Sequence, residues 1–113
     1  MTSLNYRHLH YFWVVAKEGG FARAAERLDM AIQTVSAQVR ELERALGHQL
    51  IKPEGRRLVL TTAGEAAFSR AEEIFRLGQE LPLAVQEAVG RRSVRLSVGF
   101  SDGISKLAAR ALL

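Results

Sequence analysis

Apolar residues recur at the spacing of helix faces in the N-terminal part of the chain. The first set falls at positions i, i+3, i+4 and i+7 and consists of Leu9, Phe12, Trp13 and Ala16. The second set has the same spacing and consists of Phe21, Ala24, Ala25 and Leu28. The third set falls at i, i+4, i+7 and i+11 and consists of Val35, Val39, Leu42 and Leu46. Each set predicts an amphipathic helix whose apolar face turns inward.

The residues between these sets predict where the helices end. A Gly-Gly pair at residues 19–20 stops the first helix, which is expected over residues 5–18, and Gly47 is a favourable stop for the third. Residues 29–31 leave only a tight break between the second and third helices. This order of helices predicts a helix-turn-helix.

The next stretch changes from helical to strand-like spacing. The short runs Gln49–Lys52 and Leu58–Leu60 flank the turn-forming segment Pro53–Arg57. They predict a β-hairpin with a basic tip. A hairpin directly after a helix-turn-helix forms a wing, so the predicted fold class is mainly α: a winged helix-turn-helix of three helices plus a β-hairpin, followed by a long dimerisation helix.

Residues 61–89 predict that long helix, with Thr61 as its N-cap and Glu65 favourably placed in its first turns. Small or apolar residues recur at alternating intervals of four and three residues, at Ala67, Ala71, Ile74, Gly78, Leu81, Val85 and Ala88. A helix this apolar must pack on its own domain, on another chain, or on both. We expect a homodimer through Phe68, Ala71, Ile74, Phe75, Gly78, Leu81 and Val85.

Pro82 interrupts this helix, because it has no N–H to donate to the carbonyl of Gly78. A kink or the helix end is therefore expected near residues 78–82. Beyond it, residues 90–93 predict a hinge and residues 94–99 a buried strand, followed by a helix at Ile104–Leu113. The expected division is a winged helix-turn-helix domain, a linker helix and the start of a truncated second domain, in residues 1–60, 61–90 and 91–113.

The composition is that of an ordinary domain with a mild positive charge. The 16 Lys and Arg against 12 Asp and Glu give a formal net charge of +4, which permits a polyanion partner without identifying one. The absence of cysteine excludes disulfide scaffolds and thiolate metal sites. There is no signal-peptide pattern and no apolar run of about 18 residues, so we expect a cytoplasmic protein without a membrane span. No cofactor is expected, and no metal either, because His8 and His10 fall on different faces of their helix.

The outward face of the third helix is small, polar and nearly uncharged in its N-terminal half, at Gln33, Thr34, Ala37, Gln38 and Glu41. Gln bonds adenine edges, Thr bonds a base or touches a thymine methyl, and Ala permits close approach. Arg40 and Arg44 lie further round and suit phosphates, while Arg56 and Arg57 in the wing suit a phosphate or a minor groove. A solvated surface is the alternative for these arginines.

Several motifs resemble the DNA-binding segment of the LysR-type transcriptional regulators. They are Phe21-x-x-Ala24-Ala25-x-x-Leu28, Val35-Ser36-x-Gln38-Val39-x-x-Leu42-Glu43, Leu46-Gly47-x-x-Leu50 and Leu60-Thr61-x-Ala63-Gly64. The resemblance covers about residues 5–90, and the opening of the chain is similar to the subgroup that regulates bacterial sodium/proton antiporters. It implies a recognition helix in the major groove of double-stranded DNA and a linker helix that pairs antiparallel with that of a second subunit.

The resemblance also implies residue roles by position. Base contacts fall to Gln33, Thr34, Ala37 and Gln38, and backbone contacts to Ser36, Arg40, Arg56 and Arg57. The expected site is an interrupted inverted repeat with recognition helices roughly 34 Å apart. An effector-binding domain would follow the linker, so an effector, and conceivably a tetramer, is expected only for a full-length parent. The chain departs from the family at Ala31-Ile32, where Ser or Thr followed by Gln or Pro is usual, and so lacks an N-cap worth about 1 kcal/mol.

A separate motif, GFSDG at residues 99–103, matches the G-x-S-x-G of a hydrolase nucleophile elbow. Such an elbow needs an acid and then a histidine later in the chain, but His8, His10 and His48 all lie upstream of Ser101. Ser101 is therefore not expected to be catalytic. The resemblance implies an effector contact for Ser101 instead, and a plain helix N-cap is the alternative.

Two other functions stay open at this point. One is a protein-interaction module in which the long helix is a coiled-coil dimeriser, which salt-independent DNA binding, or none, would support. The other is an enzyme fragment around Ser101, which ester hydrolysis lost in Ser101→Ala would support.

Overall fold

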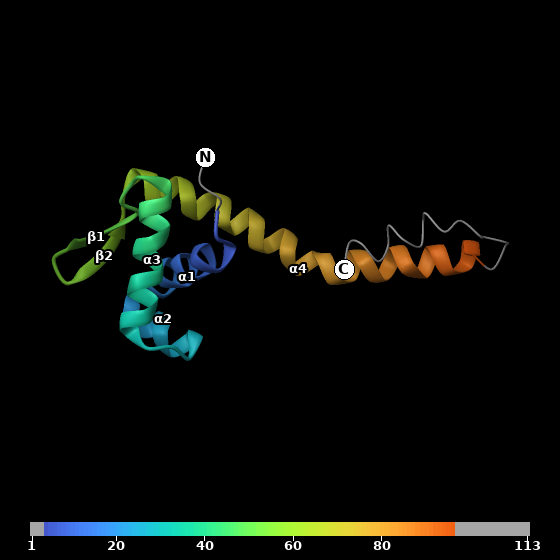
Figure 1. Ribbon diagram of the computed structural model, residues 1–113, viewed down its shortest axis with the longest axis horizontal. Coiled ribbons are helices and arrows are strands. Elements are labelled where there is room, and N and C mark those ends of the chain that lie inside the picture. Colours follow the sequence, from blue (N-terminus) through green and yellow to red (C-terminus); the bar gives the residue numbers. More distant parts are fainter. Residues whose placement is uncertain (1–3, 97–113) are drawn as a thin grey trace. The chain divides into compact units, whose positions relative to one another are not determined.

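The computed structural model describes residues 4–96, and the side chains of residues 4–91. Its elements in chain order are α1 Tyr6–Glu18, α2 Phe21–Leu28, α3 Ile32–Leu46, β1 Ile51–Glu54, β2 Arg57–Leu60 and α4 Thr62–Leu96 (Figure 1). The mainly α fold with a hairpin is confirmed. The chain divides into two units, with the boundary inside α4 between Leu77 and Gly78.

The ends of the first three helices follow from local backbone chemistry. The Asn5 side chain accepts hydrogen bonds from the N–H groups of Arg7 and His8 at 2.9 and 3.1 Å and so caps α1. Gly19 and Gly47 end α1 and α3 in the left-handed conformation, with φ of 82° and 76°. The predicted stops at both glycines are therefore confirmed.

The core lies where α1, α2 and α3 meet, and Phe12, Ala24 and Val35 are completely buried there. A buried valine or phenylalanine side chain contributes about 1.5–3 kcal/mol. One predicted inward position is wrong: Leu46 is 43% exposed. It is the last residue of α3, and the helix has by then passed beyond the elements that cover its apolar face.

The hairpin is displaced along the chain from its predicted position. β1 pairs antiparallel with β2 in the register Ile51↔Leu60 to Glu54↔Arg57. The strand therefore starts later than Gln49, and Pro53 and Arg57 belong to strands rather than to the turn. The turn is confined to Gly55-Arg56, where Gly55 takes a φ of 65° that side-chain-bearing residues rarely adopt. A proline is tolerated because both strands of a two-stranded sheet are edges.

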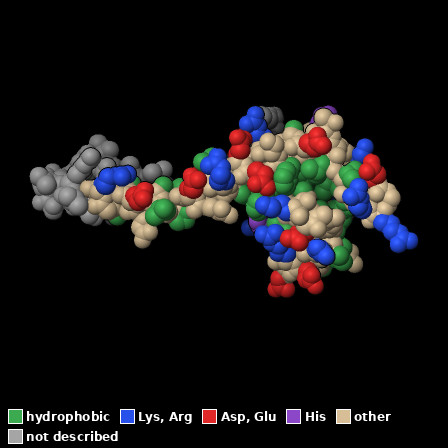
Figure 2. All heavy atoms as spheres, turned by 180° about the vertical axis from the view of Figure 1, so that it is seen from behind, with side chains coloured by type: hydrophobic (Ala, Val, Ile, Leu, Met, Phe, Trp, Pro, Cys, Tyr) green, Lys and Arg blue, Asp and Glu red, His purple; other side chains and the backbone are tan. Residues whose placement is uncertain are grey.

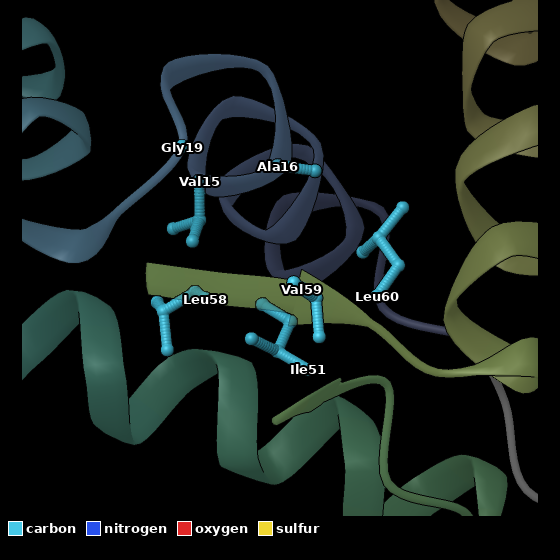
Figure 3. Close-up of a pocket in the computed structure, with 7 residues that line it drawn as sticks. All are labelled: Val15, Ala16, Gly19, Ile51, Leu58, Val59 and Leu60. Atoms are coloured by element: carbon cyan, nitrogen blue, oxygen red, sulfur yellow. The ribbon is translucent and has the colours of Figure 1, made fainter. Parts of the chain in front are cut away.

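A shallow apolar hollow separates the end of α1 from the hairpin (Figure 3). Its lining is Val15, Ala16, Gly19, Ile51, Leu58, Val59 and Leu60. In Figure 3, Val15 points from α1 toward β2. No lining side chain is charged or polar, so the contact seats the wing on the core and offers no group for chemistry.

The first turns of α4 belong to the same unit as the core and contact α1. Trp13 donates its indole N–H to Glu72 at 3.0 Å, and the Lys17 ammonium lies 4.7 Å from the centre of the Trp13 ring. The Phe75 ring packs edge-on against His10, with ring centres 5.3 Å apart. Burial, and to a smaller extent the positive charge of Arg27, lowers the pKa of His10 below its ordinary value of 6.5. The uncharged form of the His10 ring is therefore favoured at this contact.

The helical residues beyond this contact differ from expectation. Of the two alternatives predicted at residues 78–82, the helix end is wrong, because α4 continues through Pro82 to Leu96. The kink stays a prediction. The side chains of residues 78–91 are all exposed, so water can satisfy the Gly78 carbonyl that Pro82 leaves without a donor. The predicted hinge at residues 90–93 and the start of a strand at Val94 are wrong for the same reason, since α4 includes them. The remainder of that strand and the helix at 104–113 lie outside the described residues.

The residues assigned to a dimer contact separate into two groups. Ala71 is 0% exposed in the core of its own subunit, so its assignment to a contact between subunits is wrong. Phe68, Ile74 and Phe75 are half-buried against the same core. Gly78, Leu81 and Val85 are exposed. Small and apolar spacing alone could not separate these groups, because one helix continues from the first to the second.

Gly64 marks the closest approach between α4 and the chain entering the wing. A Cβ added there would overlap the carbonyl oxygen of Leu50 and lie 2.9 Å from its carbonyl carbon. Gly90, in the same helix, has no atom within 4 Å of an added Cβ. The glycine at position 64 is therefore required by space and not by backbone conformation.

We predict that Gly64→Ala lowers the free energy of unfolding by about 1–3 kcal/mol, because backbone must move to admit the methyl group. Gly90→Ala is the matched control and should be neutral or stabilising by up to about 1 kcal/mol. Urea denaturation followed by circular dichroism checks both. Equal losses in the two variants would contradict the prediction.

Candidate nucleic-acid interface

The N-terminal half of α3 presents the uncharged surface predicted from the sequence. Gln33, Thr34 and Ala37 are exposed, and Ser36 and Gln38 are half-buried on its flanks. The opposite face is anchored in the core by three completely or almost completely buried side chains, Val35, Val39 and Leu42. The packing of that buried face fixes which way the polar face points.

The first turn of α3 has free backbone donors. Ala31 occupies the N-cap position in extended conformation and offers no side-chain hydrogen bond. Its carbonyl accepts from the N–H groups of Thr34 and Val35 at 3.0 and 3.1 Å. Within the described part of the chain, the N–H groups of Ile32 and Gln33 have no acceptor. Such groups at a helix N-terminus favour a negatively charged partner.

Unpaired arginines lie on either side of this surface. Arg40 on α3 and Arg56 and Arg57 on the wing are exposed, and none of them forms an ion pair among residues 4–91. Figure 2 shows Lys and Arg side chains at the free end of the hairpin. Arg44 differs, because it pairs with Glu41 one turn earlier on α3. Of the arginines that the sequence assigned to phosphates, Arg40, Arg56 and Arg57 thus have no ion-pair partner in the described residues, whereas Arg44 has one.

Glu43 connects α3 to the wing. Its Oε2 atom accepts the N–H of Leu50 at 2.8 Å and the N–H of Ile51 at 3.2 Å. Both donors lie where the chain enters β1, and the carboxylate comes from the last turns of α3. The sequence alone assigned no role to Glu43. The signal that could have found it is an acidic residue directly after the inward-facing Leu42, and the structure half-buries that residue.

Thr61 makes the corresponding connection at the far end of the wing. Its N–H donates to the Leu50 carbonyl at 2.9 Å, and its hydroxyl donates to the Gln49 carbonyl at 2.5 Å. The same hydroxyl accepts the N–H of Gly64 at 2.9 Å, which confirms Thr61 as the N-cap of α4. The two ends of the hairpin are therefore tied together and to two helices.

A family model of bacterial regulatory helix-turn-helix proteins of the lysR family matches residues 6–65. The transcriptional activator protein NhaR of Escherichia coli (strain K12) is 37% identical over 113 residues, which is 100% of this chain and 37% of that protein. The chain belongs to the LysR family. It carries the helix-turn-helix domain of a LysR-type transcriptional regulator.

Other LysR relatives agree in sequence and in structure. The regulator AlsR of Bacillus subtilis (strain 168) is 38% identical over 83% of this chain and 31% of its own length. A complex of the CbnR DNA-binding domain with DNA superposes with a TM-score of 0.69 at 33% identity, over 75% of this chain and 98% of that one. A complex of the BenM DNA-binding domain with catB site 1 DNA gives a TM-score of 0.68 at 30% identity, over 74% and 96%.

Membership of the LysR family excludes one of the two alternatives that the sequence left open. The relatives are transcriptional regulators, so the alternative of an enzyme fragment is wrong. Ser101 lies outside the described residues. The chain spans about a third of the length of the curated relatives it matches.

Two kinds of feature are absent from the described residues of this LysR domain, a membrane-spanning helix and a metal-binding cluster. No helix in residues 4–96 has the length and hydropathy needed to span a bilayer. His, Asp and Glu side chains in the same part of the chain form no group able to hold a metal ion. The remaining chemistry of the surface is that of polar side chains, free backbone donors and cations.

We predict that Glu43→Ala lowers the free energy of unfolding by about 2–3 kcal/mol, because two amide donors lose a charged acceptor. Glu43→Gln is the matched control and should lose less than half as much, since one side-chain oxygen accepts both bonds and glutamine retains one. Urea denaturation gives the loss, and hydrogen exchange at the Leu50 and Ile51 amides locates it. The assignment fails when the two variants lose equal stability, or when those amides stay protected in Glu43→Ala.

Proposed function

We propose that the chain binds double-stranded DNA in a sequence-specific manner, with the N-terminal half of α3 in the major groove. The observation that carries this proposal is the exposed, uncharged surface of Gln33, Thr34 and Ala37 between the unpaired cations of α3 and the wing. A surface meant only for solvent would gain from charged side chains there. Polar side chains of this type match the hydrogen-bonding edges of bases.

In this proposal, Gln33, Thr34, Ala37 and Gln38 contact bases. Ser36 and Arg40 contact the phosphate backbone beside them, and the wing places Arg56 and Arg57 on a neighbouring phosphate or in the minor groove. Phosphate contacts supply affinity without sequence information, whereas base edges supply the sequence preference. Binding should therefore weaken steeply with salt while the preferred sequence stays the same.

The proposal includes a homodimer. In the second unit, Leu81, Val85 and Val89 are exposed and spaced four residues apart, so they lie along one side of α4. Figure 2 shows hydrophobic side chains reaching the surface along this part of the helix. Pairing of two such helices would bury them and place two recognition helices on an interrupted inverted repeat, roughly 34 Å apart. Gly78 permits the close approach of a second helix.

We also propose a cytoplasmic location, because the proposed DNA target lies in that compartment. Properties of a whole regulator concern a full-length protein of the length of the relatives. There we propose a small-molecule or ion effector, to which Ser101 contributes a contact, and leave a tetramer to such a protein.

The DNA-binding proposal is tested by selecting bound sites from a random duplex library and titrating salt on the selected site. We expect an enriched inverted repeat for the unaltered chain. Arg56→Ala and Arg57→Ala should each lower the salt slope by about 1 without changing the sequence preference. Gln33→Ala should cost about 1–3 kcal/mol and relax the preference at one base pair.

Two results of this selection would contradict the proposal. Salt-dependent binding without an enriched sequence would leave a nonspecific basic module. No DNA binding, or binding that salt does not weaken, would favour the protein-interaction module instead.

The dimer is tested by a pair of substitutions on opposite sides of α4. Leu81 and Leu83 are 61% and 59% exposed, but residues two apart point about 200° apart around a helix. We expect Leu81→Glu to give monomers in light scattering, because the dimer contact would bury the introduced negative charge of each subunit. Leu83→Glu should keep the dimer mass of the unaltered chain. A dimer that survives Leu81→Glu, or that both variants abolish, would contradict pairing through this side.

A further inference from the structure

Ile32 is an exposed apolar side chain in the middle of a polar surface. It is the first residue of α3, it is 48% exposed, and it is not among the partly buried residues that pack against the core. The exposed large apolar side chains on α4 form the proposed dimer contact or lie opposite it. Ile32 lies on α3, in the other unit of the chain, and is not one of the residues of that proposed contact.

Local helix chemistry does not account for an isoleucine at this position. A β-branched residue is a mediocre helix former, and the first turn of a helix gains stability from Asp, Glu or Ser instead. The exposed part of the Ile32 side chain also leaves apolar surface in contact with water, and burial of that surface would be favourable. A partner that covers Ile32 would recover that free energy.

The position of Ile32 identifies such a partner. Ile32, Ser36 and Arg40 are spaced four residues apart and so lie in one row along α3. Arg40 at the far end of the row is exposed and unpaired, which suits a phosphate. N-terminal residues of a recognition helix are the ones that reach base edges. Among the groups that bases present in the major groove, the only apolar one is the 5-methyl of thymine.

We propose that Ile32 is a specificity-determining residue that packs against the 5-methyl group of a thymine in each half-site. This inference rests on the proposed DNA binding through α3 and adds one base and one chemical group to it. The departure at Ala31-Ile32 then has a positive meaning, because the isoleucine that is unusual for the family supplies an apolar contact with a base.

Thr34 and Ala37 also carry methyl groups on the exposed face and are the competing candidates. A test must therefore remove one methyl group at a time, first from the DNA and then from the protein. Deoxyuridine in place of thymidine removes only the 5-methyl and retains every hydrogen-bonding group. Thr34→Ser removes only the side-chain methyl and retains the hydroxyl.

The experiment starts from the half-site selected by the unaltered chain and replaces each thymidine by deoxyuridine in turn. We expect one thymidine per half-site at which the replacement weakens binding about three- to fourfold, as the transfer of one methyl group implies. In Ile32→Ala this sensitivity should disappear. Thr34→Ser and Leu46→Ala should retain it, the latter being an exposed apolar control at the other end of α3.

The outcomes separate this inference from the proposed function. An enriched site that is insensitive to deoxyuridine overturns the role of Ile32 and leaves DNA recognition standing. Sensitivity that persists in Ile32→Ala also overturns it and assigns the methyl contact to Thr34 or Ala37. The absence of any enriched site overturns both. Circular dichroism of Ile32→Ala should show an unchanged fold, because the buried face of α3 is untouched.

Discussion

Three elements of this domain meet at Leu50. Its N–H donates to the Glu43 carboxylate of α3, its carbonyl accepts the N–H of Thr61, and its side chain is buried in the core. Gly64 of α4 packs against the same carbonyl so closely that no side chain fits. Every polar group of this residue is thus used, and each one is used by a different element. The direction of the wing relative to α3 depends on these bonds together with the apolar contact between the hairpin and α1, because a two-stranded ladder alone is only marginally stable.

This arrangement explains how a small domain can hold a binding surface in a defined shape. The polar face of α3 is oriented by the packing of Val35 and Val39 beneath it, which involves no charged group. The wing is oriented by hydrogen bonds with a carboxylate and a hydroxyl and by its apolar contact with α1. In the proposed complex, affinity and selectivity would therefore come from separately supported parts. The exposed arginines of the wing could then change without disturbing the side chains proposed to contact bases.

The sequence predicted most of the fold, because the helix-forming sets and the glycine stops depend on neighbouring residues. Periodicity failed where the outcome depends on how far a neighbouring element extends, as at Leu46. It also failed to divide α4, since Ala71 and Leu81 share one repeat while only the former lies under the core. Of the candidate interface, the exposed residues of α3 and the wing arginines were predictable. Glu43 was not, because its partners are backbone N–H groups whose position only the folded hairpin defines.

The β1 strand has a further property that concerns solubility. A hairpin projecting from a domain exposes strand edges that could pair with those of another molecule. In β1, Pro53 removes a backbone donor, and the exposed side chains of Lys52 and Glu54 place a charge on either side of it. The strand is also short, at four residues. Edge-to-edge aggregation is therefore disfavoured at β1, although its exposed edge could otherwise pair with another molecule. This protection should persist when the protein is concentrated and no nucleic acid is present.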